Sequence, residues 1–390
     1  MSNTFTAILP VLQEAANIVG REQVGFIPAC FKNTSASRAG LNQTINYPIM
    51  PALATANVTP AATSPAGTDI VAAAGTITMN TLKKVSWNWT GEEARAMANG
   101  DIAPYRDMFA QTLQQAMRSL TNLIENDLWV AAYKGSSRGY GTATTTPFGT
   151  AADFTDFSNI SRILDDNGAS PADRHLVLGG AAMVNLKGKQ SVLFKVNEAG
   201  NSELLRQGTV GSVLGFDVHN SYPIAPVTAG TSNNAGTTDA AGYAIGATTL
   251  TMAAAGTGTI LAGDTVVITG DASAAKYVVK TGIASLAAGG TIVLNAPGLR
   301  GTLSAATHTV TVTATETPCI ALQRNGLHLV MRAPDTGDDS ASDVTTVSDP
   351  TSGLVFQLAR YGQYMQSSWE MRVLYGVVAA NPILIATLIS

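Results

Sequence analysis

The sequence predicts an α+β protein whose body is interrupted by a small all-β domain. Three observations predict this fold class. An apolar stripe with a spacing of three or four residues runs through 104–134 and indicates one long amphipathic helix. Apolar and aromatic side chains alternate with their neighbours through 77–89, which is typical of a long strand. Short runs rich in Thr and Val, separated by turn residues, fill 224–318 and indicate a barrel or sandwich.

The composition excludes several classes of protein. Only 13% of the 390 residues are charged, about half of the roughly 25% that is usual, yet 45% are hydrophobic, which excludes a disordered chain. The net charge of −4 and the lack of a basic run exclude a general nucleic-acid binder. No apolar stretch approaches the length of a membrane span. So few charges in a large chain predict a surface that is hidden against copies of itself.

The cysteines and the N-terminus indicate a reducing compartment. Cys30 and Cys319 fit no metal or disulfide framework; we expect two buried free thiols, with a single disulfide between them as the alternative. No basic residue precedes Ile8-Leu9-Pro10, so the start of the chain is unlike a secretory signal.

The first 90 residues predict an arm and a hairpin. Residues 6–19 can form a short helix, and an arm rich in Asn, Ser and Thr follows. Residues 44–90 predict a long hairpin with its tip at 51–74, and Asp69 is the one charged residue of 39–82. One face of the return strand carries Ile77, Met79, Thr81, Lys83, Val85, Trp87 and Trp89. A two-stranded ribbon is not stable alone, so it must lie on its own body or on a neighbouring subunit.

The long helix and an α/β region follow. Pro104 suits the first turn of the helix, and Gly135 ends it. Its apolar stripe consists of Phe109, Leu113, Met117, Leu120, Ile124 and Leu128. Residues 150–223 then predict two helices and two strands: a helix through Phe157 and Leu164 that stops at Asn167-Gly168, the strand 176–178, a helix over 181–188, and the strand 216–218.

The last third of the chain predicts the inserted domain and the resumed body. Strands are expected at 248–252, 265–269, 276–279, 291–294 and 307–313. An apolar run over 320–332 turns at Asn325-Gly326, an acidic polar loop covers Asp335 to Asp349, and strands are expected at 371–375 and 383–389.

Motifs for catalysis or cofactor binding are missing from the sequence. It contains no phosphate-binding loop, no dinucleotide fingerprint, no nucleophile elbow and no zinc-protease motif, and its four histidines are scattered. We therefore expect no catalytic residue, no cofactor and no metal ligand.

The acidic loop allows two sharper interpretations. Asp335-Thr336-Gly337 is the tripeptide of aspartic proteases, but that chemistry needs two such carboxylates, and the motif occurs once. The same loop, with Asp338, Asp339 and Asp343, could hold a divalent cation through oxygen ligands, although its spacing does not match an EF-hand. Solvated like charges are the simpler interpretation.

The order of these parts resembles the major capsid protein of tailed bacteriophages, the Hong Kong ninety-seven fold. The string Leu374-Tyr375-Gly376, followed by Asn381-Pro382, resembles the family's closing strand, turn and proline. The segment 323–332 resembles the strand and turn that re-enter its central domain, and 224–318 resembles the β-barrel inserted into coat proteins of short-tailed phages of the Salmonella-phage type. No counterpart of the Lys–Asn cross-link of some relatives is evident.

The resemblance implies a division of the chain into seven parts. They are an N-terminal arm (1–43), an extended hairpin called the E-loop (44–90), a peripheral domain with the spine helix (91–149), the first part of an α/β axial domain (150–223), the inserted β-barrel domain (224–318), the second part of the axial domain (319–353), and C-terminal strands of the body (354–390).

The resemblance also implies a function without catalysis. The chain would assemble into hexamers and pentamers of an icosahedral head that encloses double-stranded DNA, with scaffolding and portal proteins as partners and no membrane. It would be part of the virion, assembled in the host cytoplasm. Candidate contacts between subunits are Ile77, Met79, Val85, Trp87 and Trp89 of the hairpin and Asp335, Asp338 and Asp339 of the acidic loop.

Three alternatives stay open at this point. A host compartment of the same fold, an encapsulin, would enclose an enzyme instead of DNA, and the inserted β-domain argues against it. A β-rich adhesin or tail protein would account for the abundance of Ala, Thr and Gly, but it requires that the 104–134 helix be absent. A hydrolase would depend on Asp335.

Overall fold

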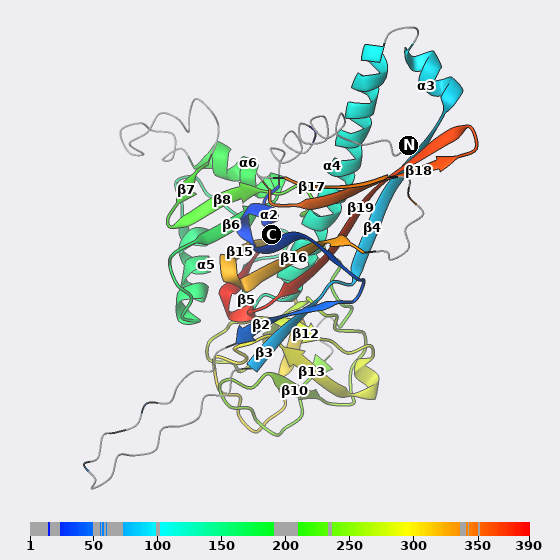
Figure 1. Cartoon of the computed structure of the whole chain (residues 1–390). Coiled ribbons are helices and arrows are strands. Elements are labelled where there is room, and N and C mark those ends of the chain that lie inside the picture. Colours follow the sequence, from blue (N-terminus) through cyan, green and yellow to red (C-terminus); the bar gives the residue numbers. More distant parts are fainter. Residues whose placement is uncertain are drawn as a thin grey trace.

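The structure, a computed structural model, describes residues 24–49, 73–98, 102–190, 210–232, 236–335, 343–349 and 352–390. It also describes the single residues Ala15, Thr55, Asn57, Pro60 and Ala341. The predicted helix over 6–19 and hairpin tip over 51–74 fall almost entirely outside the described residues, as do Asp338 and Asp339. Two sheets, a projecting ribbon and a long helix make up the described part (Figure 1).

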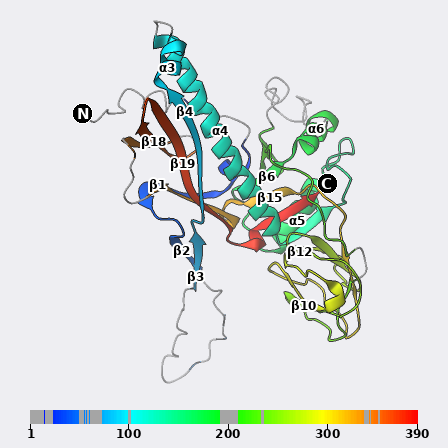
Figure 2. The ribbon, with the colours of Figure 1, turned by 90° about the vertical axis from the view of Figure 1, so that its right-hand side faces the viewer.

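The first sheet has six strands and packs against the long helix α4 (Ile102–Lys134). Its order is β1-β16-β19-β18-β17, and β4 pairs with β19. The strands are β1 (Phe31–Ala39), β4 (Thr81–Thr90), β16 (Leu327–Pro334), β17 (Asp343–Ser348), β18 (Val355–Gln363) and β19 (Gln366–Ala379). Two short helices border this layer, α2 (Phe26–Ala29) and α3 (Gly91–Ala98). Figure 2 shows α4 running across the sheet toward the second sheet.

The predicted apolar stripe of the long helix is confirmed. All six of its side chains, Phe109 to Leu128, are at most 6% exposed and belong to the largest core. The helix begins two residues before Pro104, which lies in the first turn where its missing N–H costs nothing.

The second sheet combines the α/β region with the inserted domain. Its body strands are β7 (Ser212–Val213), β8 (Phe216–Asn220), β6 (Arg174–Leu178), β15 (Cys319–Gln323), β20 (Ile385–Ile389) and β5 (Arg138–Gly141). Helices α5 (Thr155–Asp166) and α6 (Gly180–Lys189) build a separate core on it. The predicted helix and strand positions of 150–223 are confirmed to within about two residues.

The inserted domain has a core of its own but continues the body's sheet. Its strands are β9 (Gly236–Thr237), β10 (Thr249–Met252), β11 (Thr265–Ile268), β12 (Lys276–Thr281), β13 (Gly290–Leu294) and β14 (Thr309–Val312), so all five predicted strands are present. β12 pairs with β5 of the body through Lys276↔Gly139 and Tyr277↔Arg138. The amide of Asn295 also donates to the carbonyl oxygens of Lys134 and Ser136, both at 2.8 Å.

The predicted single strand over 77–89 is wrong, because the chain changes partners at Met79-Asn80. β3 (Ala73–Thr78) pairs with β2 (Thr44–Ile49), whereas β4 leaves the ribbon and pairs with β19. The crossing is close: a Cβ added to Gly376 of β19 would lie 2.4 Å from the Thr78 carbonyl oxygen. The alternation of side chains therefore continues through 77–89, although these residues belong to two different strands.

The segment 319–353 differs from its predicted assignment to one axial domain. β15 lies in the second sheet, but β16 and β17 lie in the first sheet beside α4. The turn at Asn325-Gly326, a single 3₁₀ turn, carries the chain from one sheet to the other. The predicted acidic loop also ends early, because Asp343 to Ser348 form β17, in register with β18.

Both cysteines are buried free thiols, as predicted. Burial raises the pKa of Cys30 to about 12 and that of Cys319 to about 11. Neither thiol is reactive at neutral pH, because the thiolate is the nucleophilic form.

Candidate assembly surfaces

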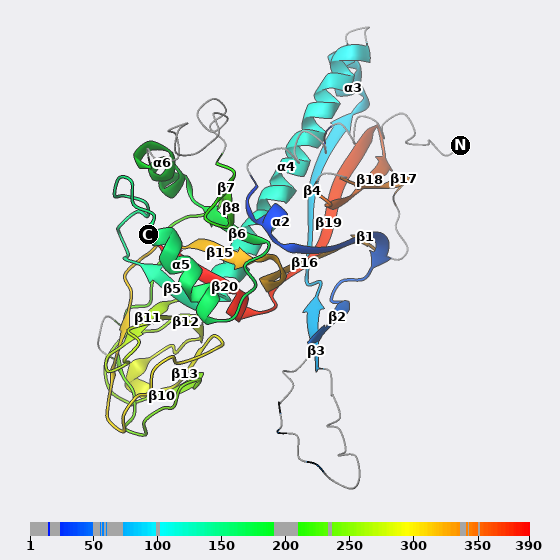
Figure 3. The ribbon, with the colours of Figure 1, turned by 90° about the vertical axis from the view of Figure 1, so that its left-hand side faces the viewer.

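The two-stranded ribbon β2–β3 is the first candidate surface for assembly. Its strands pair with each other from Thr44↔Thr78 to Ile49↔Ala73, and they form a sheet of only two strands. Figures 2 and 3 show the ribbon projecting from one end of the six-stranded sheet, clear of the inserted domain. Such a ribbon lacks a third strand or a helix to bury its face. It is therefore shaped to lie on something outside the described part of the chain.

The base of the ribbon is fixed to the body. Ile77 and Met79, 3% and 0% exposed, pack with Ala39, Val330 and Leu374. Further out, the Tyr47 ring lies over Gly75, where an added Cβ would be 2.2 Å from the ring's Cζ. The body therefore holds the ribbon as far out as Tyr47, whose ring centroid lies 5.1 Å from that of His328 in β16.

The structure separates the five hairpin residues predicted as subunit contacts. Ile77 and Met79 are buried inside the chain and leave no side-chain surface for a neighbour. Val85, Trp87 and Trp89 of β4 are half-buried and pack against the α4 core. Because β4 belongs to the body and not to the ribbon, any contact through it would use only the exposed part of these side chains.

Of the three predicted acidic contacts, only Asp335 is described. It follows β16 directly, and its backbone N–H donates to the Ala39 carbonyl oxygen at 2.8 Å. Asp335 therefore lies at the edge of the six-stranded sheet, near the root of the ribbon. That position belongs to the layer of α4 and not to the α/β region.

The tip of the β18–β19 hairpin is an exposed apolar surface that the sequence did not single out. Tyr364 is 92% exposed and Met365 is 66% exposed. Met365 also has a φ of +55°, a conformation that costs a non-glycine residue energy and that clusters at functional sites. The sequence signal for this surface is a two-residue turn made of Tyr and Met, at a place where Asn and Gly are usual.

Glu125 of α4 joins three parts of the chain. One carboxylate oxygen accepts from the backbone N–H groups of Gly25 and Phe26 at 2.5 and 2.7 Å, and the other accepts from Ile27 at 3.0 Å. The Ser221 hydroxyl donates to it at 2.6 Å. Burial raises the pKa of Glu125, while these four hydrogen bonds favour the charged form. The single carboxylate fixes the end of the arm and the end of β8 to the spine helix.

Glu316 lies buried where the inserted domain meets the body. It is 8% exposed, its Oε1 accepts from the Thr265 hydroxyl at 2.8 Å, and its Oε2 has no hydrogen-bond partner among the described residues. Burial raises its pKa to about 7, and the charge of Asp264 adds to the increase. Near neutral pH this carboxyl is therefore half ionised in a site that disfavours its charge.

The raised pKa of Glu316 predicts that the chain loses stability as the pH rises from about 5 to 8. The folded chain binds this proton more tightly than the unfolded one, whose pKa is near 4.5. The stabilisation is complete below pH 4.5, and about 3 kcal/mol of it is lost by pH 8. Thermal unfolding of Glu316→Gln, with the exposed Glu92→Gln as control, should show a flatter profile over this range. An unchanged slope in Glu316→Gln would contradict this assignment.

Within the described part of the chain, no three His, Cys, Asp or Glu side chains are placed to hold a metal ion. Among the same residues, no helix has the length and apolar character needed to cross a membrane.

Of the comparisons with known proteins, the one with solved structures shows the fold. No protein-family model matches the chain, and no curated protein is similar to it in sequence. Among solved structures, the capsid of the cyanophage P-SCSP1u aligns with a TM-score of 0.51 and 11% identity, over 94% of this chain and 88% of that one. The chain has the fold of tailed-phage capsid proteins. A capsid asymmetric unit of the cyanophage A-1(L) aligns with a TM-score of 0.49 and 11% identity, over 96% and 92%.

Along the sequence, α4 lies where the spine helix was expected, and α5 and α6 lie where the α/β region was expected. The ribbon β2–β3 and strand β4 both lie within the expected hairpin 44–90.

Proposed function

We propose that the chain is a major capsid protein that assembles, as hexamers and pentamers, into an icosahedral phage head around double-stranded DNA. The observation that carries this proposal is the capsid fold combined with a projecting ribbon of only two strands. A chain that leaves a two-stranded ribbon uncovered gains stability only when another surface covers it. In a closed symmetric shell, every copy can supply that surface to its neighbour.

In this proposal the chain acts without catalysis. Its role is to bury surface against copies of itself, and the low charge content favours such burial. Scaffolding and portal proteins are the further partners we propose, with assembly in the host cytoplasm and the virion as destination. The DNA is enclosed without specific contacts, because a mildly acidic chain has little affinity for phosphate backbones in general.

The alternatives are less well supported. The long helix α4 contradicts the β-rich adhesin, which required its absence. An encapsulin would share the fold, but no feature of the described residues favours an enzyme cargo over DNA.

The proposal is tested by expressing the full chain and following its size by sedimentation velocity and negative-stain electron microscopy. We expect closed particles of uniform diameter, alone or with a co-expressed scaffolding protein. A chain that stays monomeric under all these conditions would refute the proposal.

A further inference from the structure

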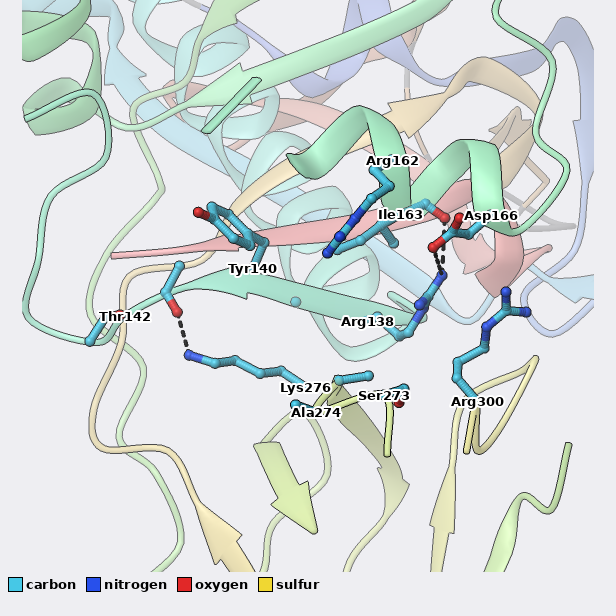
Figure 4. Close-up of a pocket in the computed structure, with 13 residues that line it drawn as sticks. Arg138, Tyr140, Thr142, Arg162, Ile163, Asp166, Ser273, Ala274, Lys276 and Arg300 are labelled. Atoms are coloured by element: carbon cyan, nitrogen blue, oxygen red, sulfur yellow. Dashed lines mark hydrogen bonds and ion pairs between the residues drawn. The ribbon is translucent and has the colours of Figure 1, made fainter. Parts of the chain in front are cut away.

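A charged cleft lies between the α/β region and the inserted domain. It has a volume of about 660 Å³ and is bounded by β5 and α5 on one side and by β12 and the loops around it on the other. Figure 4 shows Arg162 reaching from α5 toward β5, and Lys276 and Arg300 entering from the inserted domain. The cleft is thus built by two domains that are far apart in the sequence.

The cleft concentrates positive charge in a chain with few charges. Arg138, Arg162, Lys276 and Arg300 line it, and Asp166 is the one acidic side chain among the lining residues. The chain as a whole carries a net charge of −4. With four cationic side chains and one carboxylate, the lining of the cleft has a net charge of about +3.

Arg138 forms the floor of the cleft and is incompletely satisfied. Its side chain is 7% exposed, and one terminal nitrogen lies 3.7 Å from a carboxylate oxygen of Asp166. The same nitrogen donates to the Ile163 carbonyl oxygen at 3.2 Å and to the Asn167 side-chain oxygen at 2.9 Å. Its Nε is buried and has no hydrogen-bond partner among the described residues. A buried, unpaired donor on a charged group costs free energy unless a ligand accepts from it.

The other cations add to this imbalance. Lys276 donates to the Gly141 carbonyl oxygen, which is a neutral partner. In the described part of the chain, no carboxylate lies within ion-pair distance of the Arg162 or Arg300 guanidinium. Burial lowers the pKa of Arg138, and the nearby charge of Arg300 lowers it further. The like charges of Arg138 and Arg300 therefore repel each other.

We propose that this cleft binds a multiply charged oxyanion of the phosphate class. Guanidinium groups present two parallel N–H donors that match the oxygens of phosphate, and several such groups around one site suit a tetrahedral anion with more than one charge. The ligand would connect α5 to the inserted domain, whose strand β12 is joined to β5 by only two residue pairs. The anion therefore strengthens a narrow junction between the domains.

The test uses the full chain and inorganic phosphate, measured by isothermal titration calorimetry at constant ionic strength set with chloride. Arg162 is exposed and Arg300 is half-buried, so Arg162→Gln/Arg300→Gln leaves the Arg138 floor intact. We expect the double variant to bind phosphate at least about tenfold more weakly. The matched control is Lys280→Gln, an exposed lysine of the same strand β12 that does not line the cleft; it should bind like the original chain.

Further arms identify the source of the anion and the results that would overturn the proposal. In one arm, a short DNA duplex competes with phosphate for the original chain and for Lys280→Gln. Displacement of phosphate from both proteins would identify a nucleic-acid phosphate as the ligand, whereas no displacement would identify a free phosphate. Absence of saturable phosphate binding, or equal weakening in Lys280→Gln, would refute the site. The site would also be refuted if the double variant lost particle assembly while the original chain bound no phosphate. That result would indicate that a carboxylate of a neighbouring copy pairs with these arginines. Melting temperatures without phosphate check that each variant is folded.

Discussion

Replacing Glu125 with alanine should destabilise the chain by about 3 kcal/mol, because three buried backbone N–H groups and the Ser221 hydroxyl lose their acceptor together. The donors of Gly25, Phe26 and Ile27 begin helix α2, which has no other side-chain cap. Burial disfavours the charged form of Glu125 and raises its pKa, so removing the carboxylate offsets part of this loss. The net effect stays large because the unpaired donors remain inside the protein.

The measurement is thermal unfolding combined with limited proteolysis of the N-terminal arm. We expect the apparent melting temperature to fall by about 4 °C and cleavage near Gly25 to become faster. Glu125→Gln, which keeps an acceptor oxygen, should show an intermediate loss. The control is Asp107→Ala, an exposed acidic residue on the same helix. If Glu125→Ala behaves like Asp107→Ala, the carboxylate does not hold the arm.

Replacing residues 50–72, which join the two strands of the ribbon, with a short turn should abolish particle assembly and leave the fold intact. Ile49 and Ala73 face each other in register, so an Asn-Gly turn can replace residues 50–72 and close the hairpin. The ribbon root, with Ile77 and Met79 in the core, is untouched. We expect a soluble monomer or small oligomer with the original melting temperature, because the removed residues lie beyond the described pairing.

Assembly of this variant is followed by sedimentation velocity, with a second variant as the matched control. In the control, a Gly/Ser segment of equal length replaces 50–72, which keeps the reach but removes the side chains. Loss of assembly in both variants would show that assembly needs the side chains of 50–72. Normal assembly of the Gly/Ser control would show that it needs only the length of this segment. Particles of normal size from the shortened chain would contradict a role for residues 50–72 in assembly.

The sequence predicted local elements well, because their periodicity is written in neighbouring residues. The stripe from Phe109 to Leu128 and the strands of the inserted domain are of this kind. The break at Met79-Asn80 could not be predicted, because the alternation of side chains continues through it and only the pairing partner changes. The new partner is β19, whose Gly376, almost 300 residues further along the chain, lies against the Thr78 carbonyl.

The candidate sites were harder to predict for the same reason. Glu125 stands in a helix as an ordinary polar residue, and its four donors come from segments about a hundred residues away on either side. Arg138, Arg162, Lys276 and Arg300 are equally scattered; the pairing of β12 with β5 and the packing of α5 on β5 bring them to one cleft. The capsid resemblance was found from the order of the elements, which does not require knowledge of such long-range contacts.

The most direct test of the central claim is a cryo-electron microscopy reconstruction of the particles formed by the unmodified full chain. The account predicts a closed icosahedral shell of hexamers and pentamers in which each β2–β3 ribbon lies across a neighbouring subunit. A ribbon folded back onto its own body, or a preparation that contains only open aggregates, would contradict it.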